Sequence, residues 1–161
     1  MSLIKKILLP ILIVFIAIQF IQPTRNNSQQ VLPTDISKTY SISKNVNNIL
    51  KKSCYDCHSN NTDYPFYSFI QPIRWQIEKD IKNGKEKLNF SEFGSYSPRR
   101  QISKWRDIVN RINDGTMPLS SYKLIHKNAR LTKEDKEVLF NWIETTIYND
   151  SKNQNEQNAS H

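Results

Sequence analysis

Apolar residues recur every three or four positions in four segments between residues 42 and 148. This period is that of a helix with one buried face. The four stripes are Ile42, Val46, Ile49 and Leu50; Ile70, Ile73, Ile77 and Ile81; Ile102, Trp105, Val109 and Ile112; and Val138, Leu139, Trp142, Ile143 and Ile147. No run alternates apolar and polar residues as a half-buried strand does. The pattern predicts a small all-α domain over residues 42–148.

Cap residues indicate where the third and fourth of these helices begin. Ser97 and Pro98 offer an N-cap and a first-turn proline to the third helix. Thr132, with Asp135 three residues later, offers a reciprocal cap to the fourth. We therefore expect these helices to start at residues 98 and 133.

Glycine is scarce, with three residues in the chain. Gly84 and Gly115 follow the second and third stripes, where a helix ends favourably on a left-handed residue. We expect both helices to stop there. Long connections are expected around the cysteines and between the second and third helices.

The N-terminal segment is a nearly continuous apolar run rather than a stripe on one helix face. Lys5 and Lys6 precede an apolar run from Ile7 to Ile21, and no small-residue cleavage site follows it. Residues 1–22 are interpreted as an uncleaved transmembrane signal anchor, with a cleaved signal as the alternative. The two lysines favour a cytoplasmic N-terminus. The expected location is the bacterial inner membrane, single-pass, with the domain in the periplasm.

Two polar segments flank the domain. Residues 23–41 contain two prolines and few apolar side chains, and are predicted to be a linker. Residues 149–161 have Ala159 as their only apolar residue, and are predicted to be a disordered tail. His161 lies in this tail and is not a ligand candidate.

The formal net charge is +8, from 23 basic and 15 acidic residues. The lysines are spread through the chain, without an arginine-rich run or a basic stripe interleaved with aromatic residues. Nucleic acid is therefore not an expected partner. The charge indicates a solvated basic surface, or attraction to an acidic partner or to anionic lipid headgroups.

The only two cysteines stand in the pentapeptide Cys54-Tyr55-Asp56-Cys57-His58. A redox dithiol calls for a βαβ setting, and a zinc site calls for a second Cys/His pair, which is missing. A disulfide needs no histidine. A c-type haem uses this spacing, with both thiols bonded to the macrocycle and the histidine on the iron. The pentapeptide alone leaves haem and its rivals open, because an oxidising compartment suits a disulfide as well.

Met117 is the candidate for a sixth iron ligand. It is the only methionine after Met1, and it lies between Gly115 and Pro118 in a loop rather than in a core stripe. A thioether is a soft ligand that stabilises ferrous haem. His126 is the alternative ligand. Histidine at both axial positions would give a lower reduction potential.

The chain resembles class I c-type cytochromes in the order helix, CYDCH, further helices, GTMPL and a last helix LTKEDKEVLFNWI. This resemblance implies that the first and last helices cross. It also implies that an aromatic residue of the last helix packs at the crossing, here Trp142 against Ile49 and Leu50.

A narrower resemblance is to the haem-binding domain family of bacterial envelope proteins, over about residues 42–147. It rests on the motifs CYDCHSN, YPFYS, LNFSEF and MPLxxYxxxH. The family resemblance implies one covalent haem c, with Cys54 and Cys57 as attachment points and His58 as the proximal ligand.

Other residues are expected around this haem. An aromatic cluster after the attachment site is expected to wall it and exclude water. Its members are Tyr64, Phe66, Tyr67, Phe69 and Trp75. The candidate partners of the propionates are Arg74, Arg99, Asn89, Ser91 and Tyr122. For the two arginines a surface charge is the alternative interpretation.

The expected function is electron transfer by a membrane-anchored monohaem cytochrome-like protein, with an acidic redox partner protein. With both axial ligands available, a small domain has no place for a substrate, so we expect a carrier rather than an enzyme. The alternatives are a haem-based redox or gas sensor, or a peroxidase-like enzyme in which the sixth ligand is labile. A module with a disulfide and no haem is the remaining possibility.

Overall fold

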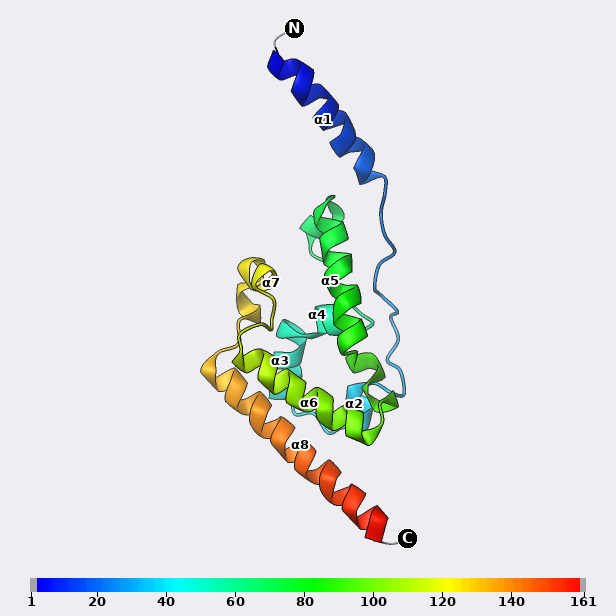
Figure 1. The fold of residues 1–161 in the computed structure, drawn as a ribbon, viewed down its shortest axis with the longest axis vertical. Coiled ribbons are helices and arrows are strands. Elements are labelled where there is room, and N and C mark those ends of the chain that lie inside the picture. Colours follow the sequence, from blue (N-terminus) through cyan, green and yellow to red (C-terminus); the bar gives the residue numbers. More distant parts are fainter. Residues whose placement is uncertain (1–2, 160–161) are drawn as a thin grey trace.

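A computed structural model describes the backbone of residues 3–159 and, except at residues 153–155 and 157–159, their side chains. This part of the chain is helical, contains no strand, and has one isolated β-bridge between Asn27 and Asn61 (Figure 1). The elements are α1 (Leu3–Gln19), α2 (Ile36–Thr39), α3 (Lys44–Ser53), α4 (Tyr55–His58), η1 (Phe66–Phe69), α5 (Ile73–Lys87), η2 (Phe90–Ser95), α6 (Pro98–Asn113), α7 (Ser120–Ile125), η3 (Lys127–Ala129) and α8 (Lys133–Ala159). The all-α prediction is confirmed.

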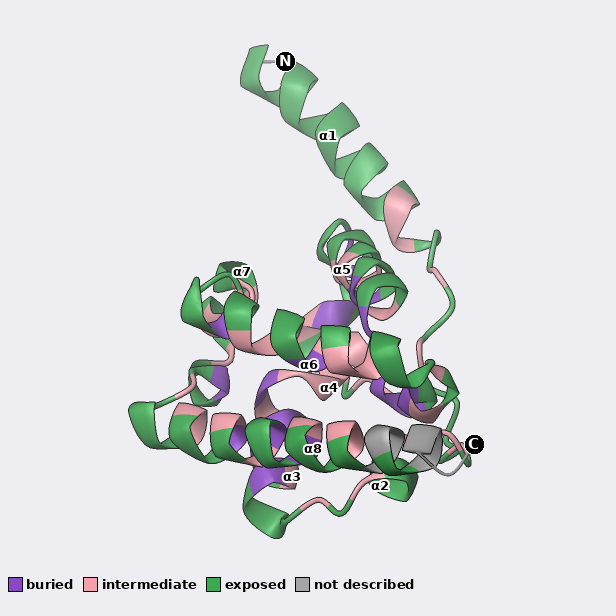
Figure 2. Cartoon of the chain, turned by 60° about the horizontal axis from the view of Figure 1, so that its bottom comes forward, coloured by how far each residue is buried: buried purple, intermediate pink, exposed green. Residues whose placement is uncertain are grey.

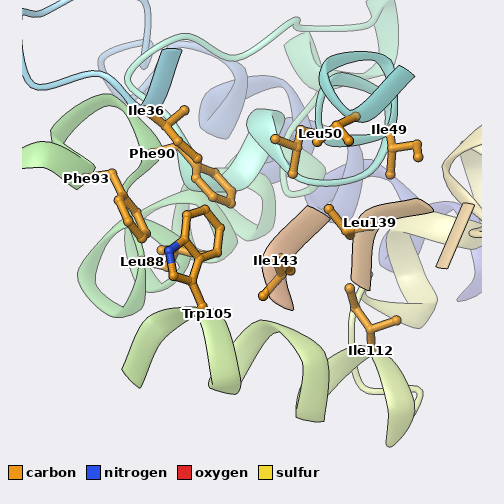
Figure 3. Close-up of a cluster of buried hydrophobic side chains, with 11 residues drawn as sticks. Ile36, Ile49, Leu50, Leu88, Phe90, Phe93, Trp105, Ile112, Leu139 and Ile143 are labelled. Carbon is orange, nitrogen blue, oxygen red and sulfur yellow. The ribbon is translucent and has the colours of Figure 1, made fainter. Parts of the chain in front are cut away.

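The hydrophobic core joins α3, α6 and α8. Figure 3 shows Trp105 and Ile112 rising from α6 toward Ile143 and Leu139 of α8. Leu50 of α3 completes this part of the cluster and is fully buried. Burying each such side chain contributes roughly 1.5–3 kcal/mol. The first, third and fourth apolar stripes of the sequence therefore form the core as predicted.

Trp142 lies at the edge of this core rather than at its centre. Its ring meets Trp105 edge-on at 5.1 Å, and its Nε1 donates to the Ser41 carbonyl at 3.1 Å. The fully buried residues of α8 are Leu139 and Ile143. These smaller side chains allow α8 to approach α3 and α6 together.

The predicted caps are largely present. Thr132 and Asp135 exchange backbone-to-side-chain hydrogen bonds of 3.0 and 3.1 Å at the start of α8. Pro98 occupies the first turn of α6, although the Ser97 side chain makes no cap bond. Gly115 follows α6 with φ +70°, the left-handed conformation expected there.

The prediction that α5 ends at Gly84 is wrong. The helix continues past Gly84 to Lys87, so this glycine does not end it. A Cβ at Gly84 would lie 2.5 Å from the carbonyl oxygen of Cys57. Gly84 is therefore required by the close approach of α5 to α4.

The buried face of α5 also differs from the predicted stripe. Ile70 and Ile73 are exposed, whereas Arg74, Ile81 and Gly84 are the buried residues. Glu78 forms an ion pair with the Arg74 guanidinium at 3.0 Å, and this pair offsets the cost of burying the charge of Arg74.

The segment predicted to be a linker packs on the domain. The Asn26 carbonyl accepts from the Thr62 amide at 2.9 Å, and the Ser28 amide donates to the Asn60 carbonyl at 3.0 Å. Further along, Ile36 of α2 is buried in the core, against η2. We call residues 21–35 the strap, because they run along the domain before α2.

The two ends of the described chain are helical. In Figure 2, α1 projects from the domain and is exposed along most of its length. None of the helices within residues 3–159 has the length and apolar character to cross a membrane, so the predicted spanning anchor lacks structural support. At the other end α8 continues to Ala159, and Asp150 accepts a hydrogen bond from Tyr40 at 2.7 Å. The predicted disordered tail is thus helical as far as Ala159, and His161 lies outside the described residues.

Candidate functional site

The cysteine pentapeptide forms a single helical turn. Cys54 ends α3 and begins α4, and its carbonyl accepts from the amides of Cys57 and His58 at 3.2 and 3.0 Å. This short turn places both thiols on the wall of the same cavity. The two thiols are thus presented together, next to His58.

His58 is oriented by the backbone that follows α5. Its Nδ1 lies 3.0 Å from the Leu88 carbonyl oxygen, which can only accept, so Nδ1 carries the proton. This leaves the lone pair of Nε2 free for a metal. Burial lowers the pKa of His58, although hydrogen bonds to the Leu88 and Gly84 carbonyls oppose the shift. The ring is therefore neutral near pH 7, the form that ligates metals.

The surroundings of the two thiols favour their protonated form. Both cysteines are free, and burial raises the pKa of Cys54 and of Cys57 to about 12. A catalytic dithiol needs a lowered thiol pKa, so this environment argues against a redox dithiol. Within the described residues, no three His, Cys, Asp or Glu side chains converge as a metal site.

We call the space beside these residues the thiol cavity; its volume is about 220 Å³. It brings Cys54, Cys57 and His58 together with Met117, which comes from the segment between α6 and α7. The rest of the lining is Ser53, Asp56, Asp80, Asn83, Gly84, Lys87, Pro118, Leu119 and Tyr122.

His126 lies elsewhere. It follows α7, where its Nε2 is hydrogen-bonded to the Tyr67 hydroxyl and its ring stacks on Tyr122 at 4.2 Å. It lines a second, larger cavity of about 930 Å³, not the thiol cavity. Asp56 and Tyr122 line both spaces and separate them. The arrangement therefore places Met117, and not His126, with His58.

A hydrogen bond joins the two sides of the thiol cavity. The Tyr122 hydroxyl on α7 donates to Asp56 Oδ2 at 2.6 Å, between the two cysteines in sequence. Burial and this bond raise the pKa of Tyr122, which keeps the hydroxyl protonated and able to donate. Tyr122 is thus the one predicted propionate partner that lines the cavity.

The other predicted propionate partners have different roles. Arg74 is buried over the Tyr64 ring, and its Nη2 donates to the Pro23 carbonyl at 3.2 Å, so it holds the strap. Arg99 is exposed in the first turn of α6. Two further candidates are hydrogen-bonded to Asn60, namely Asn89 and Ser91.

Sequence reasoning missed one wall of the cavity. Asp80, Asn83 and Lys87 project from one face of α5 around Gly84. Their spacing of three and four residues is a helical signal, but it is visible only if the helix continues beyond Gly84. Lys87 provides a positive charge at this wall, suited to a carboxylate.

The predicted aromatic wall is not at this site. Tyr64, Phe66, Tyr67, Phe69 and Trp75 do not line the thiol cavity. The aromatic ring beside His58 is instead Phe90, at 6.4 Å between centroids. Phe90 lies beside His58 because η2, which begins within the LNFSEF segment, packs against α4.

This geometry defines a class of protein. It is an all-α domain in which two thiols, a neutral histidine and a methionine line one cavity. A family model described as "Haem-binding domain" matches residues 13–145. The chain belongs to the haem-binding domain family, and it is a haem-binding protein. No curated protein and no solved structure matches the chain significantly.

The donor set fits a haem. Two thiols, an imidazole with a free Nε2 and a thioether are the groups that hold c-type haems. The cavity of about 220 Å³ is smaller than common small-molecule sites of about 300–1,000 Å³. A bound macrocycle must therefore extend beyond the present lining, or the Met117 segment must move outward. The match to the family model begins at residue 13, so it includes the strap.

Proposed function

We propose that this protein is a monohaem c-type electron carrier of the bacterial cell envelope. The observation that carries the proposal is the gathering of Cys54, Cys57, His58 and Met117 around one cavity. Bound haem c would supply one-electron redox chemistry.

The chain's own groups have distinct tasks in this proposal. Cys54 and Cys57 attach the haem as thioethers, and His58 ligates iron through Nε2 while Leu88 fixes the ring. Met117 would be the second protein ligand and would favour the ferrous state. With His58 and Met117 both committed to the iron, no iron position would be left for a substrate. This supports a carrier over an enzyme.

The proposed setting is the periplasm, with attachment to the inner membrane through the N-terminal region. Lys5 and Lys6, in the first turn of α1 and ahead of its apolar part, support this orientation. The net charge of +8 supports an acidic redox partner, since opposite charges accelerate encounter.

Covalent attachment is tested by denaturing electrophoresis with a haem stain. The protein expressed with an export signal and a cytochrome maturation system should retain haem through denaturation. Cys54→Ala and Cys57→Ala should each weaken retention, and the double variant should abolish it. Stained haem in the denatured double variant would refute the thioether assignment.

The sixth ligand is tested by optical spectroscopy. The ferric protein should show the weak near-infrared band of a methionine–iron bond, and Met117→Ala should abolish it and lower the reduction potential. His126→Ala is the matched control and should preserve the band. The reverse pattern would make the iron bis-histidine. Five-coordinate iron in the unmodified protein would instead favour the sensor or peroxidase function.

A further inference from the structure

The domain has an apolar surface that does not line the thiol cavity. We call it the apical patch; its residues are Phe66, Phe69, Ile70, Ile73, Leu124 and Ile125. Phe66 is 81 % exposed and Leu124 is 72 % exposed. Contiguous apolar surface of this kind marks a contact with a partner or with lipid.

Two distant parts of the sequence build the apical patch. One runs from η1 to the first residue of α5, and the other is α7. The hydrogen bond between Tyr67 and His126 joins them, because Tyr67 lies between Phe66 and Phe69 while His126 follows Ile125. The patch is therefore one surface rather than scattered apolar residues.

The end of α1 is attached beside this patch. Gln71 N–H donates to Gln19 Oε1 at 2.9 Å, and Gln71 Nε2 donates to the Ile21 carbonyl at 2.7 Å. Figure 1 shows α1 leaving the domain at the end where α5 begins and α7 lies. The exposed apolar surface of α1 thus continues onto the patch.

The rim of the patch is basic. Residues 119–130 include Lys123, Lys127 and Arg130 and no acidic residue. On the other side, the Arg25 guanidinium lies 4.3 Å from the centroid of the Phe69 ring. Basic groups around an apolar surface match anionic headgroups near a membrane.

We propose that the apical patch rests on an anionic bilayer surface together with α1. A lipid surface suits both parts, because α1 exposes apolar side chains around its whole circumference and has no single partner face. The proposal sets the orientation of the domain. The axis of α5 runs from Ile73 at the patch to Lys87 at the thiol cavity, roughly 20 Å at 1.5 Å per residue. That wall of the haem site would face away from the lipid, toward a soluble partner.

The test uses the full chain in vesicles of phosphatidylethanolamine and phosphatidylglycerol. A benzophenone amino acid replaces Phe66 in one variant and Tyr148 in another; Tyr148 is 69 % exposed on α8, outside the patch. After irradiation, position 66 should form lipid adducts at a yield at least fivefold above position 148. Equal yields at the two positions would overturn the proposal, as would adducts at position 66 only with a second copy of the chain.

A second pair of variants tests the basic rim. Lys127→Glu, in the chain labelled at position 66, should lower the lipid adduct yield at least twofold. Lys133→Glu is the matched control, 85 % exposed at the start of α8, and should leave the yield unchanged. Vesicles of phosphatidylcholine alone should remove the difference between them. An equal loss in both variants would refute the role of the rim. The readout is independent of the iron ligands, so the haem assignment stands or falls separately.

Discussion

At the scale of single residues, Asp56 links three parts of the haem site. Its Oδ2 accepts from Tyr122 at 2.6 Å, and its Oδ1 accepts from the Asp63 amide at 3.1 Å. Its carbonyl accepts from the Thr62 hydroxyl at 2.6 Å. Because α7 follows Met117 closely, the bond to Tyr122 holds the Met117 segment against the cysteine turn.

Tyr122→Phe should therefore loosen the Met117 segment. The ring that stacks on His126 remains, but the hydrogen bond to a carboxylate is lost, which costs about 1–3 kcal/mol in the free energy of unfolding. The near-infrared methionine band should weaken and should disappear at a lower temperature. Tyr55→Phe is the control, since its hydroxyl makes no hydrogen bond to the described part of the chain. Identical behaviour of the two variants would contradict this role of Tyr122.

At the scale of elements, the contact between α4 and α5 sets the shape of the thiol cavity. Gly84 permits the contact, because any larger residue places its Cβ 2.5 Å from the Cys57 carbonyl oxygen. The same approach brings Lys87 to the cavity and the Leu88 carbonyl to His58. The position of α5 therefore decides how His58 is oriented.

Gly84→Ala should destabilise the protein even though alanine favours helix by about 1 kcal/mol. Overpacking of this kind costs about 1–3 kcal/mol, and the shift of α5 should lower the haem-to-protein ratio. Denaturant unfolding and haem absorbance measure the two effects. Lys82→Ala, on an exposed turn of the same helix, should change neither. A gain in stability for Gly84→Ala would show that α4 and α5 are not in close contact.

The strap is held to the domain mainly through Asn26. Its Nδ2 donates to the Ser59 carbonyl at 2.8 Å, and its Oδ1 accepts from Lys85 Nζ at 2.7 Å. Asn26→Ala should lower the free energy of unfolding by about 1–3 kcal/mol, because it leaves a part-buried carbonyl and a lysine without partners. Asn48→Ala on the exposed side of α3 is the control. An equal, small effect in both variants would mean that the strap is dispensable.

At the scale of the whole molecule, the core and the haem site adjoin but are distinct. The buried cluster joins α3, α6 and α8 and reaches the site through Phe90 and Cys54, whereas Met117, His58 and α7 are outside it. A haem would add contacts among α4, α5 and the Met117 segment to those that Gly84 and Tyr122 already make. The two regions should therefore respond differently to loss of haem.

The haem-free Cys54→Ala, Cys57→Ala protein should unfold at a lower temperature, because a ligand that binds only the native state stabilises it. It should nevertheless keep most of its far-ultraviolet helical signal, which comes from the core helices. Trypsin should cut it first at Lys123 in α7 or at Lys127 just after it, before it cuts α6 or α8. Loss of the whole helical signal would show that haem and core fold as one unit.

The sequence by itself determined the helical core and the chemical groups of the site. The stripes of α3, α6 and α8, the caps at Thr132 and Gly115, and the donors Cys54, Cys57, His58 and Met117 follow from local pattern and residue chemistry. Such features depend on residues near one another in the chain. Such local features can therefore be predicted from periodicity, cap chemistry and motif spacing.

The tertiary structure decided the features that depend on distant segments. Gly84 looked like a helix end, and only the approach of α4 shows why a side chain is excluded there. Arg74 looked like a surface charge or a propionate partner, and only the strap and Glu78 account for its burial. The separation of His126 from the thiol cavity likewise depends on Tyr67, from another element. No local pattern encodes these contacts, because each joins residues that are brought together only when the chain folds.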